Sequence, residues 1–327
     1  MTFERIAYNP GSLLTMDEVL SFAKQADKNK RIDSLWIPES WGREALASLG
    51  AVSQVTRSLK LGTAIINIFS RTPATIAMAA CTLDMLSRNR TIIGLGASTP
   101  AIVEDFHGLG FAKPVARMRE YIEFIRAMIK GDKVNYEGKY VRAKGFKLLY
   151  KPQRERIPIF VACVNPNMIS LASGVADGVL LYLRPIQELK ETVMRIKLAT
   201  RHNKSFEIGC ILICAVSTRE PEKARARAAK TLAFYVSVGK YYRDFLSENG
   251  FRKETEEIAT EYLHNGLEAA SRVVPQTMLD SLTVCGTADE CVRSLSRFMS
   301  TGITLPIIQV NPVGRTESSI REMLTTF

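Results

Sequence analysis

The sequence predicts an α/β fold in which eight β-strands, each followed by at least one helix, close into a (β/α)8 barrel. Short apolar runs rich in Ile and Leu alternate with helical segments from end to end, a pattern typical of parallel strands buried on both faces. No Pro- or Ser-rich linker divides the 327 residues, which are enough for one barrel. Eight units of this kind favour a closed barrel over an open sheet.

The expected elements follow one another in a regular order. The first helix begins after Thr15, because Glu18 three residues later completes a capping box. The expected strands cover residues 3–8, 34–38, 60–66, 91–96, 157–162, 178–182, 208–216 and 305–310. The expected helices cover residues 16–29, 44–58, 74–87, 115–130, 167–174, 187–202 and 287–300. This alternation predicts parallel strands joined by right-handed crossovers.

Two insertions interrupt this order, after the fourth and after the seventh strand. The first covers about residues 109–152 and contains an expected hairpin over 134–141 that turns at Glu137 and Gly138. The second covers about residues 219–275 and is largely helical, with breaks expected at Gly250 and Gly266. We therefore expect a single barrel domain over residues 1–327.

The composition argues against several classes of protein. The formal net charge is +11, but basic and acidic residues are mixed as on solvated helix faces, so we expect no nucleic acid partner. No run approaches the roughly 20 apolar residues of a membrane span, and Met1–Arg5 lacks the apolar core of a signal peptide. We therefore expect a cytoplasmic protein without membrane contact. The six cysteines show no metal-ligand spacing, which predicts reduced core thiols and no metal site.

Candidate site residues lie where the expected strands end, because catalysis in a barrel occurs at the C-terminal ends of its strands. Glu39 follows the second strand, and its carboxylate could act as a general acid or base or bind a polar ring edge. It could equally be a charge favoured by a helix N-terminus. Trp36 is expected in the core, whereas Trp41 could stack on a planar ligand or pack in the core.

Two further strand ends offer backbone groups to a ligand. The pattern Gly-x-Gly-x-Ser at 94–98 could present N–H groups and a hydroxyl to a phosphate or a flat ring, or its glycines could serve tight strand packing. Asn165 can cap a helix that begins at Pro166, and the free N–H groups there would form either an anion site or an ordinary helix start. His107 could relay a proton or be a loop residue.

Several motifs, spread over nearly the whole chain, carry a family resemblance. They are Leu61–Ile65, Thr72–Ala74, Ala79–Ser87, Gly94–Gly96, Lys113–Val115 with Arg119, Ile157–Ile159, Ala176–Gly178, Val284–Thr287, and the tail Asn311–Gly314 with Ser319 and Ile320. Together they resemble the bacterial luciferase-like superfamily, and within it the branch that uses the deazaflavin coenzyme F420. The tail is similar to the end of methylenetetrahydromethanopterin reductase.

The resemblance implies a barrel of the bacterial luciferase-like type, with a non-prolyl cis peptide at Ala64-Ile65 that supports the deazaflavin from behind. It also implies cofactor-binding positions. On the ring side these are Glu39, Ala64, Ile65, Asn67, Gly96, Ala97 and Ser98, and on the phosphate side Ala162, Cys163, Val164, Asn165 and Met168. Ile6 and Thr99 stand where methanopterin reductases have carboxylates, and Glu39-Ser40 replaces their Asp-His. These departures argue against methylenetetrahydromethanopterin as the substrate.

The leading hypothesis is therefore a coenzyme F420-dependent oxidoreductase that transfers a hydride between the deazaflavin C5 and a small organic substrate. The cofactor would supply the hydride chemistry, while Glu39 or a bound water would handle the proton. Two alternatives remain open at this point: an FMN-dependent luciferase-like monooxygenase and a non-catalytic flavin-binding barrel. The resemblance also implies a homodimer.

Overall fold

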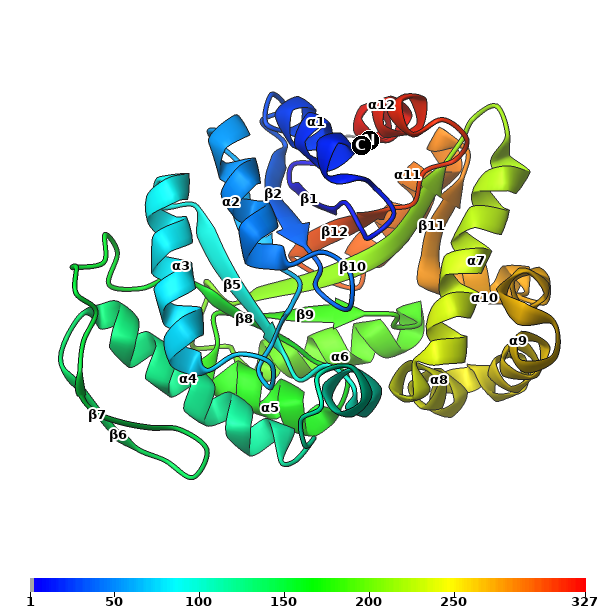
Figure 1. Ribbon diagram of the computed structural model, residues 1–327. Coiled ribbons are helices and arrows are strands. Elements are labelled where there is room, and N and C mark those ends of the chain that lie inside the picture. The colour runs from blue at the N-terminus through cyan, green and yellow to red at the C-terminus, as the bar shows by residue number, and fades with distance from the viewer. Residues whose placement is uncertain (1–2) are drawn as a thin grey trace. The chain divides into compact units, whose positions relative to one another are not determined.

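The computed structural model describes residues 3–327 (Figure 1). These residues divide into two compact units. The first unit contains the N-terminal segment through Glu18, Leu181–Leu198 and Ile208–Phe327. The second unit contains Val19–Leu180 and Ala199–Glu207. We do not expect the N-terminal segment Met1–Arg5 to be a signal peptide. Its first two residues lie outside the described residues.

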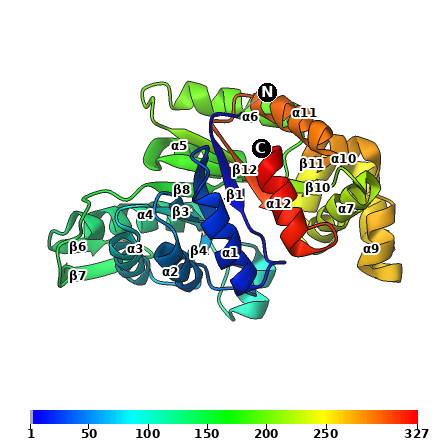
Figure 2. The ribbon, with the colours of Figure 1, turned by 90° about the horizontal axis from the view of Figure 1, so that it is seen from above.

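The second unit is built on a parallel sheet covered by helices. Its strands are β2 (Ile32–Ile37), β3 (Lys60–Thr63), β4 (Ile66–Asn67), β5 (Thr91–Gly96), β8 (Ile159–Ala162) and β9 (Gly178–Tyr182). β3 pairs with β2 and β5, β4 pairs with β5, and β8 pairs with β5 and β9. Its helices are α1 (Met16–Ala26), α2 (Ala45–Val55), α3 (Pro73–Ser87), α4 (Pro114–Lys130) and α5 (Pro166–Val175). In Figure 2, α2, α3 and α4 pack side by side.

Trp36 shows how the residues of this sheet determine its packing. The side chain is fully buried on β2, its Nε1 donates to the Ser34 hydroxyl at 2.9 Å, and its ring lies 5.3 Å from the Phe160 ring of β8. A Cβ at Gly62, the neighbouring position on β3, would lie only 2.4 Å from the indole, so this position requires glycine. The core role predicted for Trp36 is confirmed.

The first unit has its own parallel strands. They are β1 (Ile6–Asn9), β10 (Glu207–Val216), β11 (Thr283–Gly286) and β12 (Leu305–Val310). β12 pairs with β1 and β10, and β10 also pairs with β11. The helices are α6 (Ile186–Ala199), α7 (Pro221–Val238), α8 (Lys240–Leu246), the π-helix η2 (Ser247–Phe251), α9 (Arg252–Arg272), α10 (Gln276–Leu282), α11 (Ala288–Met299) and α12 (Thr316–Thr326). Buried side chains of α7, α9 and α10 form one apolar cluster with β10.

The two predicted insertions have the expected secondary structure. The first contains an antiparallel hairpin of β6 (Val134–Glu137) and β7 (Arg142–Phe146), whose turn is longer than the two residues expected. The Glu120 carboxylate of α4 holds this turn, because it accepts N–H groups from Lys139, Tyr140 and Val141 at 2.7–2.9 Å. In the second insertion the helix breaks fall at Gly250 and Gly266, as predicted, since both have positive φ values of 97° and 77°.

The structure corrects the sequence prediction in several places, and α12 and the π-helix η1 (Ala101–Phe106) were not among the expected helices. β11 was not expected, because its four residues end directly at the cap of α11 and leave no long apolar run. The helix expected over 187–202 ends at Ala199, so His202 lies in the following turn. The third strand is not continuous but splits into β3 and β4.

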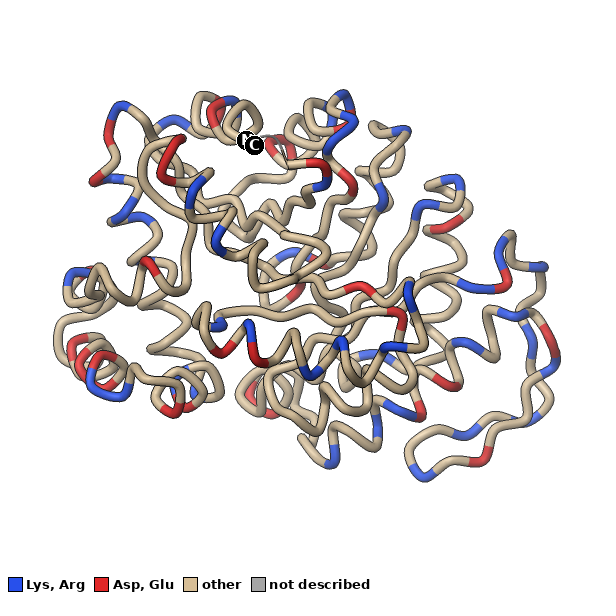
Figure 3. Tube along the Cα trace, turned by 180° about the vertical axis from the view of Figure 1, so that it is seen from behind, with Lys and Arg blue, Asp and Glu red and all other residues tan. Residues whose placement is uncertain are grey.

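Charge and burial agree with an ordinary globular chain. Figure 3 shows Lys and Arg interspersed with Asp and Glu along the trace. Five of the six cysteines are buried and Cys285 is half-buried, so the predicted core positions are confirmed for five. Within residues 3–327, no helix has the length and hydropathy that crossing a membrane requires. The same described range holds no group of three His, Cys, Asp or Glu side chains suited to a metal ion.

Candidate functional site

A bulge separates β3 from β4 at one of the predicted cofactor positions. Against β5, Leu61 lies opposite Thr91 (91 − 61 = 30), whereas Ile66 lies opposite Leu95 (95 − 66 = 29). One extra residue therefore lies on the bulged strand between the two pairs. The peptide bond of Ala64-Ile65, inside this stretch, is cis, as the resemblance predicts.

Two glycines of β5 allow this bulge to lie directly against the strand. A Cβ at Gly94 would lie 1.9 Å from the carbonyl oxygen of Thr63, and a Cβ at Gly96 would lie 2.5 Å from Cγ1 of Ile65. The Thr63 hydroxyl also donates to the Gly94 carbonyl and accepts from its N–H, both at 2.8 Å. The packing role that the sequence left open for the glycines is confirmed, and ligand contact at Gly96 stays a prediction.

Asn67 ends the bulged strand with an unused hydrogen-bond donor. Its side chain is only 4% exposed, and its Oδ1 accepts the Phe69 N–H at 2.8 Å. Its Nδ2 is buried without a hydrogen-bond partner among the described residues. Because a buried amide N–H without a partner costs free energy, this atom suits a ligand that brings an acceptor.

The loop after β5 completes the ring-side set. Ala97 and Ser98 are half-buried, and Ser98 has a positive φ of 62°, which turns the chain sharply away from the strand. The π-helix η1 (Ala101–Phe106) follows and ends at His107. The structure thus brings most of the ring-side positions together on β4, on β5 and in the loops beside them.

The predicted phosphate-side residues lie around the start of α5, but several of their polar groups are already used. Asn165 caps the helix, since its Oδ1 accepts the Met168 N–H at 2.9 Å. The Cys163 N–H donates to the Leu180 carbonyl at 3.1 Å, and its Sγ donates to the Val161 carbonyl at 3.3 Å. The capping role of Asn165 is confirmed, while phosphate binding at Ala162, Cys163, Val164, Asn165 and Met168 stays a prediction.

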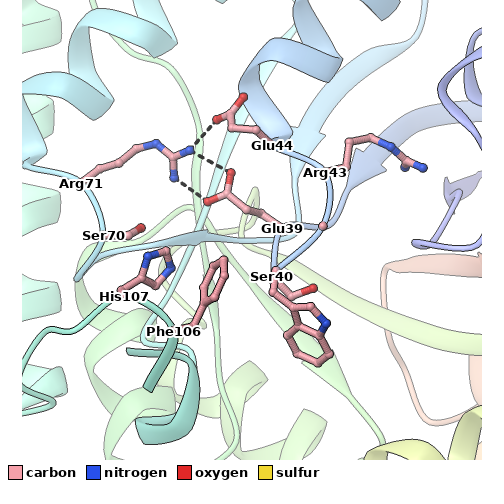
Figure 4. Close-up of a pocket in the computed structure, with 10 residues that line it drawn as sticks. Glu39, Ser40, Arg43, Glu44, Ser70, Arg71, Phe106 and His107 are labelled. Atoms are coloured by element: carbon pink, nitrogen blue, oxygen red, sulfur yellow. Dashed lines mark hydrogen bonds and ion pairs between the residues drawn. The ribbon is translucent and has the colours of Figure 1, made fainter. Parts of the chain in front are cut away.

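Glu39 lies at the end of β2 in an ion-paired cluster (Figure 4). Its carboxylate accepts from Arg71 Nη1 at 2.5 Å and Nη2 at 3.0 Å, and from the Ala45 N–H of α2 at 3.0 Å. Arg71 Nη2 also donates to Glu44 Oε1 at 2.6 Å. The side chains of Glu39 and Arg71 are 12% and 20% exposed, so the pair is largely shielded from water. Both oxygens of the Glu39 carboxylate are therefore engaged by donors of the chain itself.

A cavity of about 300 Å³ opens beside this cluster. It is lined by Glu39, Ser40, Trp41, Gly42, Arg43, Glu44, Ser70, Arg71, Phe106 and His107. Trp41 and Phe106 expose 53% and 58% of their surface, so the core-packing alternative for Trp41 is wrong. In Figure 4 the His107 ring lies between Ser70 and Phe106. The cavity therefore combines aromatic walls, two hydroxyls, one imidazole and a neutralised guanidinium.

Sequence reasoning missed several residues of this site. It singled out neither Arg71 nor Glu44, because an arginine in a loop after a strand carries no signal until its partners are known. Ser70 and Phe106 were missed for the same reason. The one available signal was position, since Ser70 and Arg71 follow the third strand as Glu39 follows the second.

The comparisons with known proteins identify the family. The model of the luciferase-like monooxygenase family matches residues 2–305. The chain belongs to this family. Among its relatives, the 5,10-methylenetetrahydromethanopterin reductase of Archaeoglobus fulgidus is 26% identical over 303 residues, which cover 90% of each protein.

Solved structures show the fold of this luciferase-like chain. The coenzyme F420-dependent tetrahydromethanopterin reductase of Methanopyrus kandleri superimposes with a TM-score of 0.88 at 21% identity, over 99% of this chain and 98% of that one. An F420-dependent secondary alcohol dehydrogenase, solved with an F420-acetone adduct, superimposes with a TM-score of 0.79 at 18% identity, over 100% and 98%. The fold is a (β/α)8 barrel of the luciferase-like type, as the sequence predicts.

Proposed function

We propose that this protein is a coenzyme F420-dependent oxidoreductase that transfers a hydride between the deazaflavin C5 and a small organic substrate. The observation that carries the proposal is the buried, unpartnered Nδ2 of Asn67 beside the bulge at Ala64-Ile65. Such a donor suits a carbonyl on the edge of a flat heterocycle. The names of the relative and of the two solved structures support the same cofactor class.

The residues of the second unit fit this cofactor. Bound there, the deazaflavin would supply or accept the hydride, which no side chain can do. Ala64 and Ile65 would support the ring, Asn67 would donate to its edge, and Gly96, Ala97 and Ser98 would line its other side. The start of α5, from Ala162 to Met168, would face the phosphate. With the cofactor bound in this way, the cavity beside Glu39 would remain available for the substrate.

In this proposal, Glu39 would help to bind and orient the cofactor. The sequence analysis assigns the proton to Glu39 or to a bound water, but both oxygens of this carboxylate already accept hydrogen bonds from Arg71 and from the Ala45 N–H. We therefore assign Glu39 to the cofactor side of the site.

Fluorescence titration of the purified protein with oxidised F420 and, separately, with FMN tests the proposal. We expect F420 to bind more tightly than FMN. Asn67→Ala should weaken F420 binding by about tenfold, the loss of one hydrogen bond. Asn135→Ala, an exposed asparagine of β6, is the matched control and should leave binding unchanged.

Each outcome of this titration supports or refutes one part of the proposal. Tighter binding of FMN would favour the monooxygenase alternative. Failure of both cofactors to bind would refute the proposal, and equal F420 affinity of wild type and Asn67→Ala would refute the role of Asn67. The homodimer, which the family resemblance implies, and the cytoplasmic location, which the sequence composition predicts, stay part of this proposal.

A further inference from the structure

The cavity beside Glu39 needs a group that can exchange a proton with the substrate, and its carboxylates do not provide one. Glu39 accepts three hydrogen bonds, and Glu44 accepts from Arg71 at 2.6 Å and from the Ala47 N–H at 2.5 Å. Both carboxylates are therefore already engaged by donors within the chain. The Ser40 and Ser70 hydroxyls do not titrate near neutral pH.

His107 is the remaining side chain of the cavity lining that is neither a carboxylate, a hydroxyl nor a guanidinium and that can exchange a proton. An imidazole gains and loses a proton near neutral pH, which suits a general acid or base. His107 is half-buried at the end of η1, and its ring lies 4.8 Å from the Phe106 ring. Within residues 3–327 its ring nitrogens make no hydrogen bond, so they are available to a substrate.

The charges of the cavity indicate what kind of substrate enters it. Two carboxylates, Glu39 and Glu44, balance two guanidinium groups, Arg43 and Arg71. Arg71 is paired with both carboxylates, and Arg43 points away from this cluster in Figure 4. The walls include exposed aromatic rings. A cavity with balanced charge and aromatic walls favours an uncharged substrate with an apolar or aromatic body.

We infer that His107 is the catalytic residue that transfers the proton to and from the oxygen of an uncharged carbonyl compound or alcohol bound in this cavity. The inference rests on the proposed function, which supplies the hydride. In the direction of reduction, the bound deazaflavin would supply a hydride to the substrate carbon and release its ring N–H proton to solvent, while the π pair of the C=O bond moves to oxygen. The proton of the His107 imidazolium passes to this oxygen, and the neutral imidazole then takes a proton from water. Oxidation of the alcohol reverses each step.

Several charged groups lie on the elements that line the cavity or carry His107. Glu39, Arg43 and Glu44 face the cavity from the segment after β2, and Arg71 faces it from the loop after β4. Glu104 and Asp105 belong to η1 itself.

The first readout is the pH dependence of turnover with acetophenone and 1-phenylethanol as probes. In the wild type, reduction should fall as the pH rises, because the donating group must start protonated, and oxidation should fall as the pH drops, because the accepting group must start unprotonated. His107→Gln should lower both rates by about 100-fold and remove this break. External imidazole should restore part of the rate. His264→Gln, an exposed histidine of α9, is the control and should behave as the wild type.

The second readout does not depend on turnover. The chain contains three histidines, so their C2–H proton signals can be assigned by NMR with the two variants. Adding acetophenone to the F420 complex should shift the His107 signal and should leave the His202 and His264 signals unchanged. A His107 signal that does not respond, or a His107→Gln variant with the wild-type rate and pH profile, would overturn the inference.

F420 binding by His107→Gln should stay within about twofold of wild type, because this residue touches the substrate. Failure of the wild type to bind F420 would instead refute the proposed function, and this inference with it.

Discussion

The contact between Gly96 and Ile65 leads to the sharpest prediction about the site. A Cβ at position 96 would lie 2.5 Å from Cγ1 and 2.6 Å from Cδ1 of Ile65. Carbon atoms pack best at about 3.5–4.0 Å, so the Ile65 side chain must move by about 1 Å in Gly96→Ala. Overpacking of this kind costs about 1–3 kcal/mol in the free energy of unfolding.

A double-mutant cycle measured by urea denaturation tests this reasoning. Ile65→Ala removes both of the atoms that the new methyl group would meet. The double variant Gly96→Ala, Ile65→Ala should therefore be more stable than the two single losses predict, by about 1 kcal/mol or more. F420 affinity should fall in Gly96→Ala, because Ile65 is displaced at the proposed ring face.

The matched control is Gly174→Ala in α5, where an added Cβ meets no atom within 4 Å. Replacing this helical glycine should raise the free energy of unfolding by about 0.5–1 kcal/mol. A Gly96→Ala protein as stable as the wild type, or single-variant losses that simply add, would show that β5 does not approach Ile65 as the structure describes.

Three further predictions concern ion pairing, pH and thiol reactivity. Arg71→Met leaves the Glu39 carboxylate without its main donors and should lower the free energy of unfolding by about 1–3 kcal/mol in a urea titration, whereas an unchanged stability would contradict the pairing. Burial alone would raise the pKa of Asp27, but the backbone N–H groups of Leu59, Ser58 and Arg57 lower it overall. The ionised Asp27 carboxylate should therefore add to the free energy of unfolding above the ordinary pKa of an aspartate. This contribution should be lost as the pH falls through the lowered pKa of Asp27. Asp27→Asn should flatten the acid side of the stability curve, and a curve identical to the wild type would refute this assignment. Burial raises the pKa of Cys81 and Cys285 to about 11, so iodoacetamide should label the native protein much more slowly at pH 8 than the unfolded chain, as mass spectrometry would show.

Much of the fold could be predicted because local patterns and the fold agree. The capping box at Thr15 and Glu18 starts α1, with the Thr15 N–H donating to Glu18 at 2.7 Å. Glycines with positive φ break the helices of the second insertion where expected. These signals act over a few residues, so a single sequence contains them in full.

The site was harder to predict because its contacts join distant segments. Arg71 meets Glu39 across 32 residues, and nothing near either residue indicates the partner. The unpartnered Nδ2 of Asn67 is likewise a property of the folded surroundings. The position of the bulge came from the family resemblance, since the spacing of the strand alone predicts a continuous run.

The extra residue in the bulge also decides which way the next side chains point. Successive side chains of a strand alternate between its two sides, so an uninterrupted run would place Asn67 on the same side as Leu61. With the insertion, Asn67 pairs with Gly96 and shares the side of Gly62, which pairs with Ile92. Deleting one residue between Thr63 and Ile66 would restore the regular alternation of side chains and place the Asn67 amide on the opposite side of the strand. One inserted residue therefore determines on which side of the strand the Asn67 side-chain amide lies.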